Sequence, residues 1–500
     1  MITIIYSTHK DKEYNDKFND HLVLTSGLQW VQVLPYVNHN EYSLSELYNK
    51  GIKESKYDIV VCCHNDIKLE KNWGKKLLED FSNNPEFGII GKAGSCYFPE
   101  SGVYWEKMNE TMVGQVYHHP KGQNKWINKY SPKLPFLIPV VTIDGLFMSF
   151  NKTKIKHTFD ETIGKFHFYD HLFCVPNYLS GVKIGVTSSF EITHESVGRP
   201  NDEFWMSKDK FVEKWGSKLP LDLKPSSPYV PIIQRKNFKK FGKVAIIIPT
   251  KGNVEMLKEC VDSYYEHCDK DKFDIFIADT GSTEEEKKWI KENIKGITLI
   301  EYNYYNFAKI NNNVVKNLPN NNYTFLLFSN NDVKILNDVI TGMLSVFDKN
   351  KMTGTVGCRL HYEDNTIQHN GIFLYLSQQS KSIIVKYKDV NSYYNFSKDT
   401  LPVIGNTAAI MMVRKDMFIN VGMFNEVYDH CWEDVELNLK IKLKGFENII
   451  NGNCVAYHYE SKTRNIDLEQ VELSNQYNNI LIPFIKSNFE KLKNNIFYTQ

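Results

Sequence analysis

The chain has 500 residues, with 60 Lys and Arg against 59 Asp and Glu, which gives a formal net charge of +1. Nucleic-acid binding draws most of its affinity from a basic excess, so this balance disfavours a nucleic-acid-binding protein. Hydrophobic residues make up 42% and aromatic residues 13%, which excludes disordered, collagen-like and disulfide-scaffold classes. At about 100–200 residues per domain, the length predicts two to four domains.

The predicted elements of the first half are apolar strands that alternate with helical stretches and end in polar residues. In chain order these strands and motifs are Ile2–Ser7, Asp58–Cys63 with His64-Asn65-Asp66, Gly88–Gly91, Thr142–Lys152, the acidic helix start at Asp170, and Phe190–Thr193 before His194. Strands alternating with helices predict an α/β domain with a largely parallel sheet. The two Asn-Asp motifs of the chain end buried-type strands, so we expect both at the carboxyl edge of a sheet, where ligands bind.

The second half repeats this order of residue types. Its matching segments are Val244–Ile248, Tyr323–Ser329 with Asn330-Asn331-Asp332, Gly354–Gly357, Val403–Lys415, the acidic helix start at Asp434, and Cys454–Tyr457 before His458. The two acids of each half are 104 residues apart in the first (66 to 170) and 102 in the second (332 to 434). In both halves the histidine follows 24 residues after the second acid. The repetition predicts two similar domains, with chance resemblance of two generic α/β domains as the alternative.

The predicted domain borders follow from composition. We expect a first domain over residues 1–218, a linker over 219–243, a second domain over 244–465 and a C-terminal helical extension over 466–500. The linker contains four prolines and a basic run around Arg235, and is typical of an extended, semi-stiff connection. A basic run is commonly solvated, and docking to an anionic membrane surface is the alternative. The extension predicts a helix over about Asp467–Asn494 that packs on the second domain, or else contacts a partner or membrane.

Secretion and membrane signals do not stand out in this sequence. The longest apolar runs, Phe136–Val141 and Val244–Pro249, fall far short of the about 20 residues that span a bilayer. The N-terminus lacks a basic segment before an apolar core, so we expect no signal peptide. Nine cysteines without a C-x-x-C pair are typical of a reducing compartment and argue against a structural zinc site. These patterns favour a cytoplasmic protein.

The two Asn-Asp motifs carry the first candidate chemistry. A carboxylate at the end of a buried strand can hold Mg²⁺ or Mn²⁺ beside a diphosphate, whose oxygens and water complete the shell. Asp66 and Asp332 are therefore candidate metal ligands. An Asx-turn or a helix cap is the alternative role for such an acid. His194 and His458 are candidates to complete the metal shell or to touch phosphate.

The acids at the two helix starts carry the second candidate chemistry. Asp434 and Glu433 begin a predicted helix, and Asp170 begins the corresponding helix of the first half. A carboxylate there is stabilised by the helix dipole, so we expect it to stay ionised, as a general base requires. Simple capping of the helix is the alternative. Asp279, which ends the strand Phe273–Ala278, is a candidate to bind a ribose or a base edge.

Several common catalytic motifs are missing from the sequence. There is no G-x-G-x-x-G and no phosphate-binding P-loop, so hydride transfer and ATP hydrolysis have no support. There is no G-x-S-x-G nucleophile motif either. A sugar-1-phosphate nucleotidyltransferase needs a Gly-rich basic loop after the first strand, and Pro249-Thr250-Lys251-Gly252 is too sparse for one.

With these residues in place, both halves resemble the family 2 glycosyltransferases of the GT-A fold. The second half is similar to bacterial polysaccharide and rhamnosyl-type members over about 220 residues, and the first half resembles a more divergent branch. The resemblance rests on motifs that occur in the family's order: Ile246–Gly252, Asp279–Ser282, Asn306–Asn312, Ser329–Val333, Thr407–Arg414, Gly422–Glu426, Trp432–Leu437 and His458, with His64–Ile67, Ile143–Phe147, Phe166–Asp170 and Thr193–Gly198 in the first half. It implies an α/β fold of two tandem GT-A domains with mostly parallel sheets.

The resemblance also implies a role for each matched position. Asp434 would be the catalytic base with Glu433 beside it, and Asp170 the base of the first half. Asp332 and His458, and in the first half Asp66 and His194, would hold a divalent metal, Mn²⁺ or Mg²⁺. The nucleotide-sugar donor, a UDP- or dTDP-sugar, would be bound by residues of the second half: Pro249, Thr250, Asp279, Asn306, Lys309, Asn330 and Asn331.

The sequence departs from the family in two places. Each family D-x-D motif keeps one carboxylate here, as Asn330-Asn331-Asp332 and as His64-Asn65-Asp66. The first half also lacks a clear partner for Asp279, and Asn38 and His39 stand nearest to that position. These departures leave the metal dependence of both halves and the nucleotide of the first half open.

The resemblance implies inverting transfer of sugars onto hydroxyls of a growing bacterial surface glycan, such as a capsule or O-antigen. Two active domains are the first hypothesis, and one active C-terminal domain with an inactive or acceptor-binding N-terminal domain is the second. A carbohydrate-binding or structural protein is a third reading, against which the retained acids count. The expected partners are a nucleotide-sugar and a glycan or lipid-linked acceptor, with no nucleic acid. A lipid-linked acceptor would place the protein peripherally at the inner face of the cell membrane.

Overall fold

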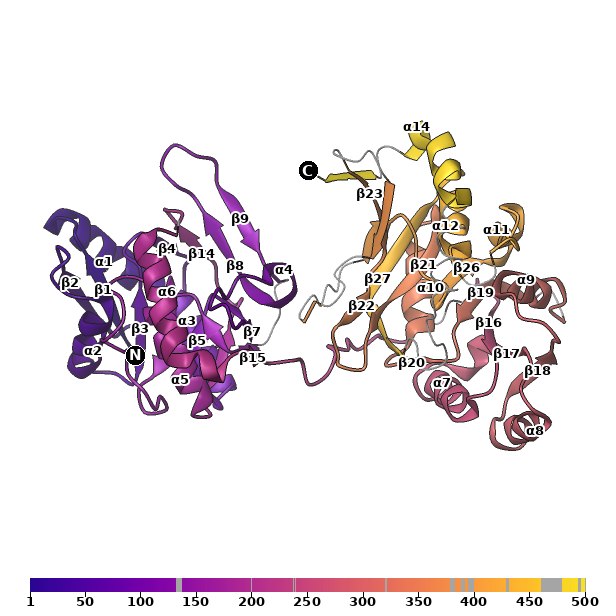
Figure 1. The fold of residues 1–500 in the computed structure, drawn as a ribbon, viewed down its shortest axis with the longest axis horizontal. Helices are drawn as coiled ribbons and strands as arrows, with labels where there is room; N and C mark the ends of the chain where they lie inside the picture. The colour runs from indigo at the N-terminus through magenta and orange to yellow at the C-terminus, as the bar shows by residue number, and fades with distance from the viewer. Residues whose placement is uncertain are drawn as a thin grey trace. The chain divides into compact units, whose positions relative to one another are not determined.

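A computed structural model describes residues 1–131, 137–198, 200–236, 238, 240–319, 322–377, 383–387, 392–393, 400–428, 431–459, 479–492 and 496–499. The chain divides into two compact units. Unit 1 is Met1–Lys224 with Ser392–Asn395, and unit 2 is Pro225–Asn391 with Phe396–Gln500. Figure 1 traces unit 1 from indigo to magenta and unit 2 from magenta to yellow.

Unit 1 alternates strands and helices from its first residues. Its elements are β1 (Ile2–Thr8), α1 (Lys12–Ser26), β2 (Val31–Val37), α2 (Leu44–Glu54), β3 (Ile59–Cys63), β4 (Ile67–Leu69), α3 (Trp73–Asn83), β5 (Phe87–Gly91), β6 (Ala93–Ser95), β7 (Tyr97–Phe98), α4 (Met108–Thr111), β8 (Met112–His118), β9 (Trp126–Lys129), β10 (Ile138–Val140), β11 (Thr142–Ile143), β12 (Phe147–Asn151), α5 (Tyr169–Leu179), β13 (Lys183–Val186), β14 (Ile192–His194), α6 (Asp202–Trp215) and β15 (Leu221–Asp222).

Unit 2 follows the same plan. Its elements are β16 (Lys243–Thr250), α7 (Val254–His267), β17 (Phe273–Asp279), α8 (Glu284–Asn293), β18 (Ile297–Glu301), α9 (Phe307–Lys316), β19 (Tyr323–Ser329), β20 (Val333–Ile335), α10 (Val339–Lys349), β21 (Thr353–His361), β22 (Ile367–His369), β23 (Ile372–Ser377), β24 (Ile383–Tyr387), β25 (Thr400–Val403), β26 (Ile410–Arg414), α11 (Lys415–Asn420), α12 (Glu433–Leu443), β27 (Glu447–His458), α14 (Phe489–Leu492) and β28 (Ile496–Thr499).

The main sheets of the two units share one strand order. In unit 1 the order is β10-β13-β5-β12-β3-β1-β2, and in unit 2 it is β20-β27-β21-β26-β19-β16-β17-β18. In each sheet one central strand, β12 or β26, runs antiparallel to both of its neighbours. The strands β1, β2 and β3 are parallel to one another, as are β16, β17 and β19. The predicted parallel sheet is therefore interrupted at the same place in both units.

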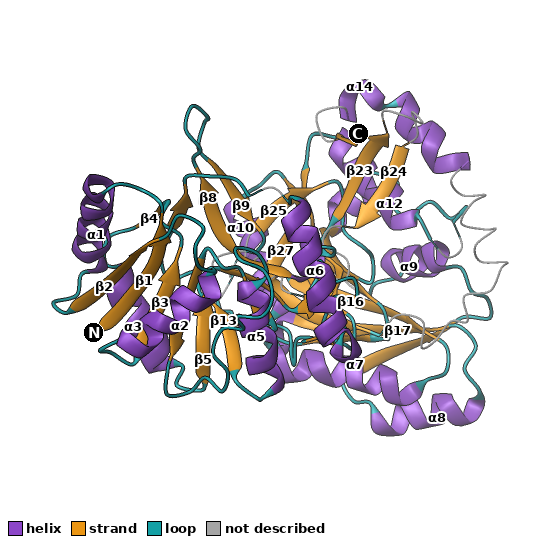
Figure 2. Cartoon of the chain, turned by 60° about the vertical axis from the view of Figure 1, so that its left-hand side comes forward, coloured by secondary structure: helices purple, strands orange, loops and turns teal. Residues whose placement is uncertain are grey.

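Apolar residues cover both faces of the unit 2 sheet, which explains why its strands are hydrophobic throughout. One face packs against buried side chains of α7, α8 and α10, and the other against those of α9, α11 and α12. Figure 2 shows α7 and α8 on one side of β16 and β17, and α9 and α12 on the other. In unit 1, Trp73 and Leu77 of α3 pack on one face with Phe18 of α1. On the opposite face, Phe173 of α5 contacts Phe150 of β12.

Residues 219–243, predicted as a linker, are attached over much of their length. Leu221 and Asp222 form β15, which pairs with β7 in unit 1. Beyond the division at Lys224, the Tyr229 carbonyl accepts a hydrogen bond from the buried Arg359 guanidinium of unit 2. The predicted C-terminal helix lies partly outside the described residues, namely over 467–478. Residues 479–487 are helical, and Ile496–Thr499 forms strand β28 beside β23.

Within the described part of the chain, no helix is both long enough and apolar enough to cross a membrane.

Candidate functional site

The Asn330-Asn331-Asp332 turn of unit 2 joins β19 to β20 at the carboxyl edge of the sheet. Asn331 Nδ2 donates a hydrogen bond of 3.0 Å to Thr250 Oγ1 at the end of β16. The backbone N–H of Asn330 donates a hydrogen bond to the Ala409 carbonyl at 2.9 Å. Because the turn is fastened to two neighbouring strands, the side chain of Asp332 has a fixed direction.

Asp332 faces a histidine from the far end of β27. The Asp332 side chain is almost buried, and its Oδ1 lies 3.2 Å from Nε2 of His458. The other ring nitrogen, Nδ1, lies 2.7 Å from Oε1 of Gln368, which can only accept a hydrogen bond. Nδ1 of His458 therefore carries the proton, and Nε2 keeps its lone pair toward Asp332 and Asn330. A neutral imidazole that shares its open side with a carboxylate is a donor set that fits a divalent cation, with Gln368 in the orienting position.

Asp434 lies one residue inside the start of α12, and its carboxylate is held by backbone amides. The helix begins after Trp432, which has the left-handed φ of 76°. Oδ2 of Asp434 accepts from the Ala408 amide at 3.0 Å, and Oδ1 accepts from the Val435 amide at 2.7 Å. The burial of the carboxyl raises the pKa of Asp434, although these amides act in the opposite direction. The predicted stabilisation by the helix dipole is therefore outweighed by burial. The side chain of Glu433 beside it is buried.

A buried amide network fixes α12 to the sheet. Asn438 is fully buried, and its Nδ2 donates to the Asp434 carbonyl at 2.7 Å and to the Asn406 carbonyl at 2.9 Å. Its Oδ1 accepts from Thr355 Oγ1 at 2.7 Å, and its backbone carbonyl accepts from Asn448 Nδ2 at 2.9 Å. Because these bonds join α12 to β21 and β27, Asn438 sets where Asp434 stands.

Replacing Asn438 with Leu should destabilise unit 2 by about 3 kcal/mol. The change leaves the Thr355 hydroxyl without an acceptor for its proton and the buried Asn406 carbonyl without the side-chain donor, at about 1–3 kcal/mol each. Urea unfolding of the full chain measures the loss as a lower midpoint. The matched control is Asn293→Leu, which removes an Asn–carbonyl bond of the same i−4 kind from the exposed end of α8. Equal midpoints for the two variants would contradict the role of the network.

The acid that ends β17 is buried deeply. Asp279 is 0% exposed, and one carboxylate oxygen accepts hydrogen bonds from the amide and hydroxyl of Ser282. Its other oxygen, Oδ2, is buried and has no hydrogen-bond partner among the residues that the structure describes. Asp279 pairs in register with Thr250, whose carbonyl accepts from Thr280. A buried carboxylate oxygen without a partner is costly, which favours a ligand donor at this position.

Three further residues were predicted to bind the donor. Asn306 caps α9 through the Lys309 amide at 2.7 Å, and its Nδ2 donates to the Glu426 carbonyl at 3.0 Å. Its side chain is thus occupied in holding the helix start. Lys309 is exposed, with its Nζ 4.8 Å from the centre of the Tyr304 ring. Pro249 is buried inside the sheet, one residue before Thr250.

Unit 1 repeats the metal-side geometry. Nδ2 of Asn65 donates to Thr8 Oγ1 at 3.0 Å, the bond that Asn331 and Thr250 make in unit 2. Oδ1 of Asp66 lies 3.3 Å from Nε2 of His194. Burial acts to raise the pKa of Asp66, but His194 and neighbouring groups outweigh it, so the pKa lies well below the usual range. Both predicted metal ligands of each unit therefore meet in space.

Unit 1 repeats the base-side geometry as well. Oδ2 of Asp170 accepts from the Gly145 amide at 2.9 Å, and Oδ1 accepts from the His171 amide at 2.8 Å. The helix that carries it, α5, begins after Phe168, which has a left-handed φ of 65°. An aromatic residue with positive φ stands two positions before the acid in both units. Such strain is uncommon outside functional sites.

The two units differ in two places. In unit 2 Thr250 pairs with the buried Asp279, whereas in unit 1 Thr8 pairs with Val37, which is 57% exposed. The acid of unit 2 therefore has no counterpart in unit 1. Asn38 stands nearest to that position in the sequence. Its backbone N–H donates a hydrogen bond to the Thr8 carbonyl, as the backbone N–H of Thr280 does to the Thr250 carbonyl, so Asn38 corresponds to Thr280. The second difference is His64, which stands where unit 2 has Asn330.

The sequence reasoning missed two residues of these sites. Gln368 lies on β22 in a segment without a recognisable motif, and only the fold brings it to His458. The sequence motif that contains His64 indicates no role for its side chain. Its Nδ1 lies 3.5 Å from Nε2 of His194, and its Nε2 lies 3.0 Å from the Tyr169 hydroxyl. The sequence signal that could have indicated His64 is that a histidine stands where the family's D-x-D motif has its first carboxylate.

Two cavities of about 490 Å³ each flank the unit 1 site. One opens beside the ends of β1 and β2, where Thr8 and Asn38 line it. The other contains Asp170 and is lined largely by aromatic side chains, among them Trp105 and Phe204. His64 lines both cavities.

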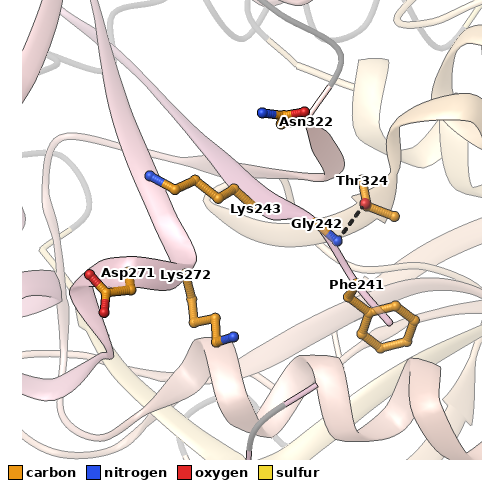
Figure 3. Close-up of a pocket in the computed structure, with 7 residues that line it drawn as sticks. All are labelled: Phe241, Gly242, Lys243, Asp271, Lys272, Asn322 and Thr324. Atoms are coloured by element: carbon orange, nitrogen blue, oxygen red, sulfur yellow. Dashed lines mark hydrogen bonds between the residues drawn. The ribbon is translucent and has the colours of Figure 1, made fainter. Parts of the chain in front are cut away.

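The unit 2 cavity drawn in Figure 3 is a different feature. It has a volume of about 380 Å³ and is lined by Lys243, Lys272, Asp271 and neighbouring residues. Lys243 is the first residue of β16 and Thr250 the last. At about 3.3 Å per residue, the cavity lies about 20 Å along the strand from the acid–histidine pair. It therefore belongs to the opposite edge of the sheet.

Taken together, the two units are two α/β domains in tandem, each with an acid–histidine pair and an amide-held acid at the carboxyl edge of its sheet. Residues 3–214 match the family described as Glycosyltransferase like family, and residues 245–422 match Glycosyl transferase family 2. The chain thus carries two family 2-type glycosyltransferase domains in tandem, which confirms the predicted family and fold class.

Two curated proteins are similar to about half of the chain. The O-antigen biosynthesis protein RfbC of Myxococcus xanthus is 25% identical over 246 residues, which is 47% of this chain and 19% of that protein. The uncharacterized protein y4gI of Sinorhizobium fredii is 26% identical over 260 residues, 50% of this chain and 28% of that protein. The chain thus spans less than a third of the length of these relatives.

Two solved structures are similar to about half of the chain. GalNAc-T7 with UDP, GalNAc and Mn²⁺ has a TM-score of 0.37 at 11% identity, covering 44% of each chain. The mannosyltransferase PcManGT from Pyrobaculum calidifontis, in complex with GDP-Man and Mn²⁺, has a TM-score of 0.32 at 13% identity. It covers 45% of this chain and 58% of its own.

Proposed function

We propose that the chain is a bifunctional, inverting glycosyltransferase that transfers sugars from nucleotide-sugar donors to hydroxyls of a bacterial surface glycan. One observation carries this proposal. The acid–histidine pair and the amide-held acid occur in both units with the same geometry, 3.3 and 2.9 Å in unit 1 against 3.2 and 3.0 Å in unit 2. A protein that only binds carbohydrate does not require both an acid–histidine pair and an amide-held acid in each unit.

In the proposed reaction Asp434 is the general base of the second domain. Its carboxylate takes the proton of an acceptor hydroxyl while the hydroxyl oxygen attacks the anomeric carbon. The bond from that carbon to the phosphate oxygen breaks, and the nucleoside diphosphate leaves with the electron pair. The two backbone amides hold the carboxylate in place, so its approach to the hydroxyl costs little entropy. Asp170, held by Gly145 and His171, is the corresponding base of the first domain.

A divalent cation, Mn²⁺ or Mg²⁺, is the proposed cofactor. Asp332 and His458 would hold it in the second domain, and Asp66 and His194 in the first. When bound, the cation supplies positive charge that neutralises the leaving diphosphate. In the second domain Gln368 keeps His458 in the tautomer that can act as a ligand.

The proposed donor of the second domain is a UDP- or dTDP-sugar. Support comes from Asp279, whose unpartnered Oδ2 can accept from a base N–H or a ribose hydroxyl. The first domain has Val37 at this position and would recognise its nucleotide by other groups.

The presence of Val37 in the first domain, where the second domain has Asp279, supports a second candidate function. In this function only the C-terminal domain transfers sugar. The first domain would then bind the acceptor, for which its aromatic cavity around Asp170 offers stacking surfaces. The proposed acceptor is a glycan or lipid-linked glycan, in keeping with the O-antigen relative. We place this work in the cytoplasm, with peripheral contact at the inner membrane face when the acceptor is lipid-linked.

A donor panel tests the proposal. The full chain is incubated with UDP-, dTDP- and GDP-sugars and a glycan acceptor, and release of nucleoside diphosphate is measured with the anomeric configuration of the product. We expect release that depends on the acceptor, with inversion at the anomeric carbon. A product of retained configuration, or no release from any donor, would rule the proposed reaction out.

The pH profile of second-domain transfer should show a base with a raised pKa. Asp434 acts only when deprotonated, and its burial raises its pKa, so activity is lost on acidification at a higher pH than for an ordinary aspartate. The acid limb of kcat/KM should therefore have its midpoint above about 3.9. Constant kcat/KM down to that pH would contradict the assignment.

A further inference from the structure

The aromatic cavity of unit 1 contains a second carboxylate besides that of Asp170. Asp144, which follows β11, is half-buried and lines the same cavity of about 490 Å³. Its Oδ1 accepts a hydrogen bond from the backbone N–H of Leu146 at 2.8 Å, and Asp170 accepts from the backbone N–H of Gly145. Consecutive backbone nitrogens are less than about 4 Å apart, so the two carboxylates lie close together in the cavity.

Unit 2 has a neutral side chain at the position of Asp144. The backbone N–H that holds the acid at the helix start belongs to Gly145 in unit 1 and to Ala408 in unit 2. The residue before it is Asp144 in unit 1 and Thr407 in unit 2. Both side chains accept a hydrogen bond from the backbone N–H two residues further on. The Thr407 hydroxyl is also a hydrogen-bond partner of the Asp434 carboxylate. Unit 1 therefore keeps the turn but has a carboxylate in place of a hydroxyl.

The second oxygen of Asp144 is held by a tyrosine. Oδ2 accepts from the Tyr104 hydroxyl at 2.8 Å, and Tyr104 is itself almost buried, with its ring centre 4.5 Å from that of His171. An ionised carboxylate has about four lone-pair sites, and these two hydrogen bonds use two of them. Because both oxygens are held, the remaining lone pairs of Asp144 can accept from a ligand with little further loss of side-chain entropy.

The other walls of the cavity fit a sugar ring without charge. Trp105 and Phe204 line the cavity and are half-buried, with their ring centres 5.3 Å apart. Ligand sites commonly combine aromatic walls with a few fixed polar groups, and a sugar offers C–H groups to the first and hydroxyls to the second. Among the described residues that line the cavity, none is a lysine or arginine. An anionic ligand would therefore meet two like charges there.

We propose that Asp144 determines which acceptor the first domain takes, namely an uncharged sugar whose hydroxyl beside the reacting hydroxyl donates to Asp144. The reacting hydroxyl then faces Asp170, because two neighbouring hydroxyls on a ring match two carboxylates held by consecutive backbone N–H groups. A sugar that carries a carboxylate or phosphate is rejected by charge. The proposal rests on the proposed role of Asp170 as the base, and it adds the class of acceptor and the residue that selects it.

Binding of simple glycosides to the full chain tests this without any donor. The probes are the methyl glycosides of glucose, galactose, mannose, rhamnose, glucuronic acid and galacturonic acid, and their dissociation constants are measured by saturation-transfer NMR. We expect a neutral glycoside to bind and the two uronides not to bind. Asp144→Thr, which installs the residue of unit 2, should weaken the neutral glycoside by about 10–100-fold, the usual effect of losing one hydrogen bond to a charged group. Trp105→Ala should weaken the same signal, which assigns it to unit 1.

Monodeoxy analogues of the bound glycoside identify the hydroxyl that Asp144 binds. One analogue should bind to the wild-type chain about as weakly as the parent glycoside binds to Asp144→Thr. That analogue should also bind equally to both chains, because the hydroxyl and the carboxylate are two partners of one interaction. If Asp144→Thr weakens every analogue as much as it weakens the parent glycoside, Asp144 does not contact the sugar and the proposal is wrong.

Asp160→Thr is the matched control. Asp160 is a half-buried acid of unit 1 that also accepts from the backbone N–H two residues further on, at 2.9 Å, but it does not line the cavity. This variant should bind the glycosides as the wild type does. Equal affinity of Asp144→Thr and wild type, uronides bound as well as neutral glycosides, or no neutral glycoside bound at all would each overturn the proposal.

Asp144→Asn decides the matter if Asp144→Thr fails to fold. It keeps the size of the side chain and removes its charge, so the preference for the neutral glycoside over the uronide should fall at least about tenfold. An unchanged preference overturns the proposal.

Transfer assays run in parallel separate this proposal from the proposed function. Binding of a neutral glycoside that depends on Asp144, in a chain that transfers no sugar, would contradict the proposed function alone. First-domain transfer to uronides with the same kcat/KM as to neutral glycosides would contradict the selection by Asp144 alone.

Discussion

Replacing Asp434 with Asn should lower transfer by the second domain by about 10²–10⁴-fold, which is the usual contribution of a positioned general base. The amide keeps the size of the carboxylate but cannot take a proton at neutral pH. It can also accept a hydrogen bond with only one of its two terminal atoms, so the bond from Ala408 or that from Val435 is lost. The measurement is kcat for the donor that the second domain uses.

The control for this variant is Asp416→Asn. Asp416 also stands in the first turn of a helix, α11, and accepts from the next amide at 2.7 Å, but it is exposed. The Asp416→Asn variant should transfer sugar at the wild-type rate. Near-wild-type transfer by Asp434→Asn, with thermal unfolding unchanged, would show that another group is the base.

Replacing Asp332 with Ala should lower second-domain transfer by about 10³-fold. Charge neutralisation by a metal contributes several kcal/mol, and about 1.36 kcal/mol corresponds to a tenfold change in rate. The turn itself should survive, because the Asp332 carbonyl, which accepts from Tyr459 at 2.9 Å, is kept by Ala. The measurements are kcat and Mn²⁺ binding by dialysis.

Asp348→Ala is the control for the loss of a carboxylate in the same unit. Asp348 pairs with Lys240 at 2.6 Å at the surface, where solvent screening makes such a pair contribute little to stability. Mn²⁺ binding and transfer should stay unchanged in this control. Unaltered Mn²⁺ binding by Asp332→Ala would remove Asp332 from the metal site.

The sequence predicted the parts of the site that repeat along the chain. Asp66 and Asp332 each end a buried strand, and that pattern alone indicated the carboxyl edge of a sheet. The equal distance of 24 residues from the second acid of each half to the histidine indicated a shared site. The structure places His194 beside Asp66 and His458 beside Asp332. Local pattern and spacing are properties that one sequence can display.

Other parts of the site depend on contacts between distant segments. Gln368 reaches His458 from 90 residues away, and no motif marks it. The absence of an acid opposite Thr8 became certain only from strand register, because Val37 and not Asn38 occupies the paired position. The pKa of Asp434 followed burial, which the sequence does not reveal, and so moved against the helix dipole. The antiparallel strands β12 and β26 likewise follow from tertiary pairing.

The claim that both domains transfer sugar is tested most directly by donor use in two double variants. One combines Asp66→Ala with Asp170→Asn, and the other combines Asp332→Ala with Asp434→Asn. Nucleoside diphosphate release is measured for every donor that the wild-type chain consumes. We predict that each double variant loses a different donor and keeps the other. If the Asp332→Ala/Asp434→Asn variant loses all transfer and the Asp66→Ala/Asp170→Asn variant loses no transfer, the claim of two active domains is contradicted. The C-terminal domain would then be the single enzyme.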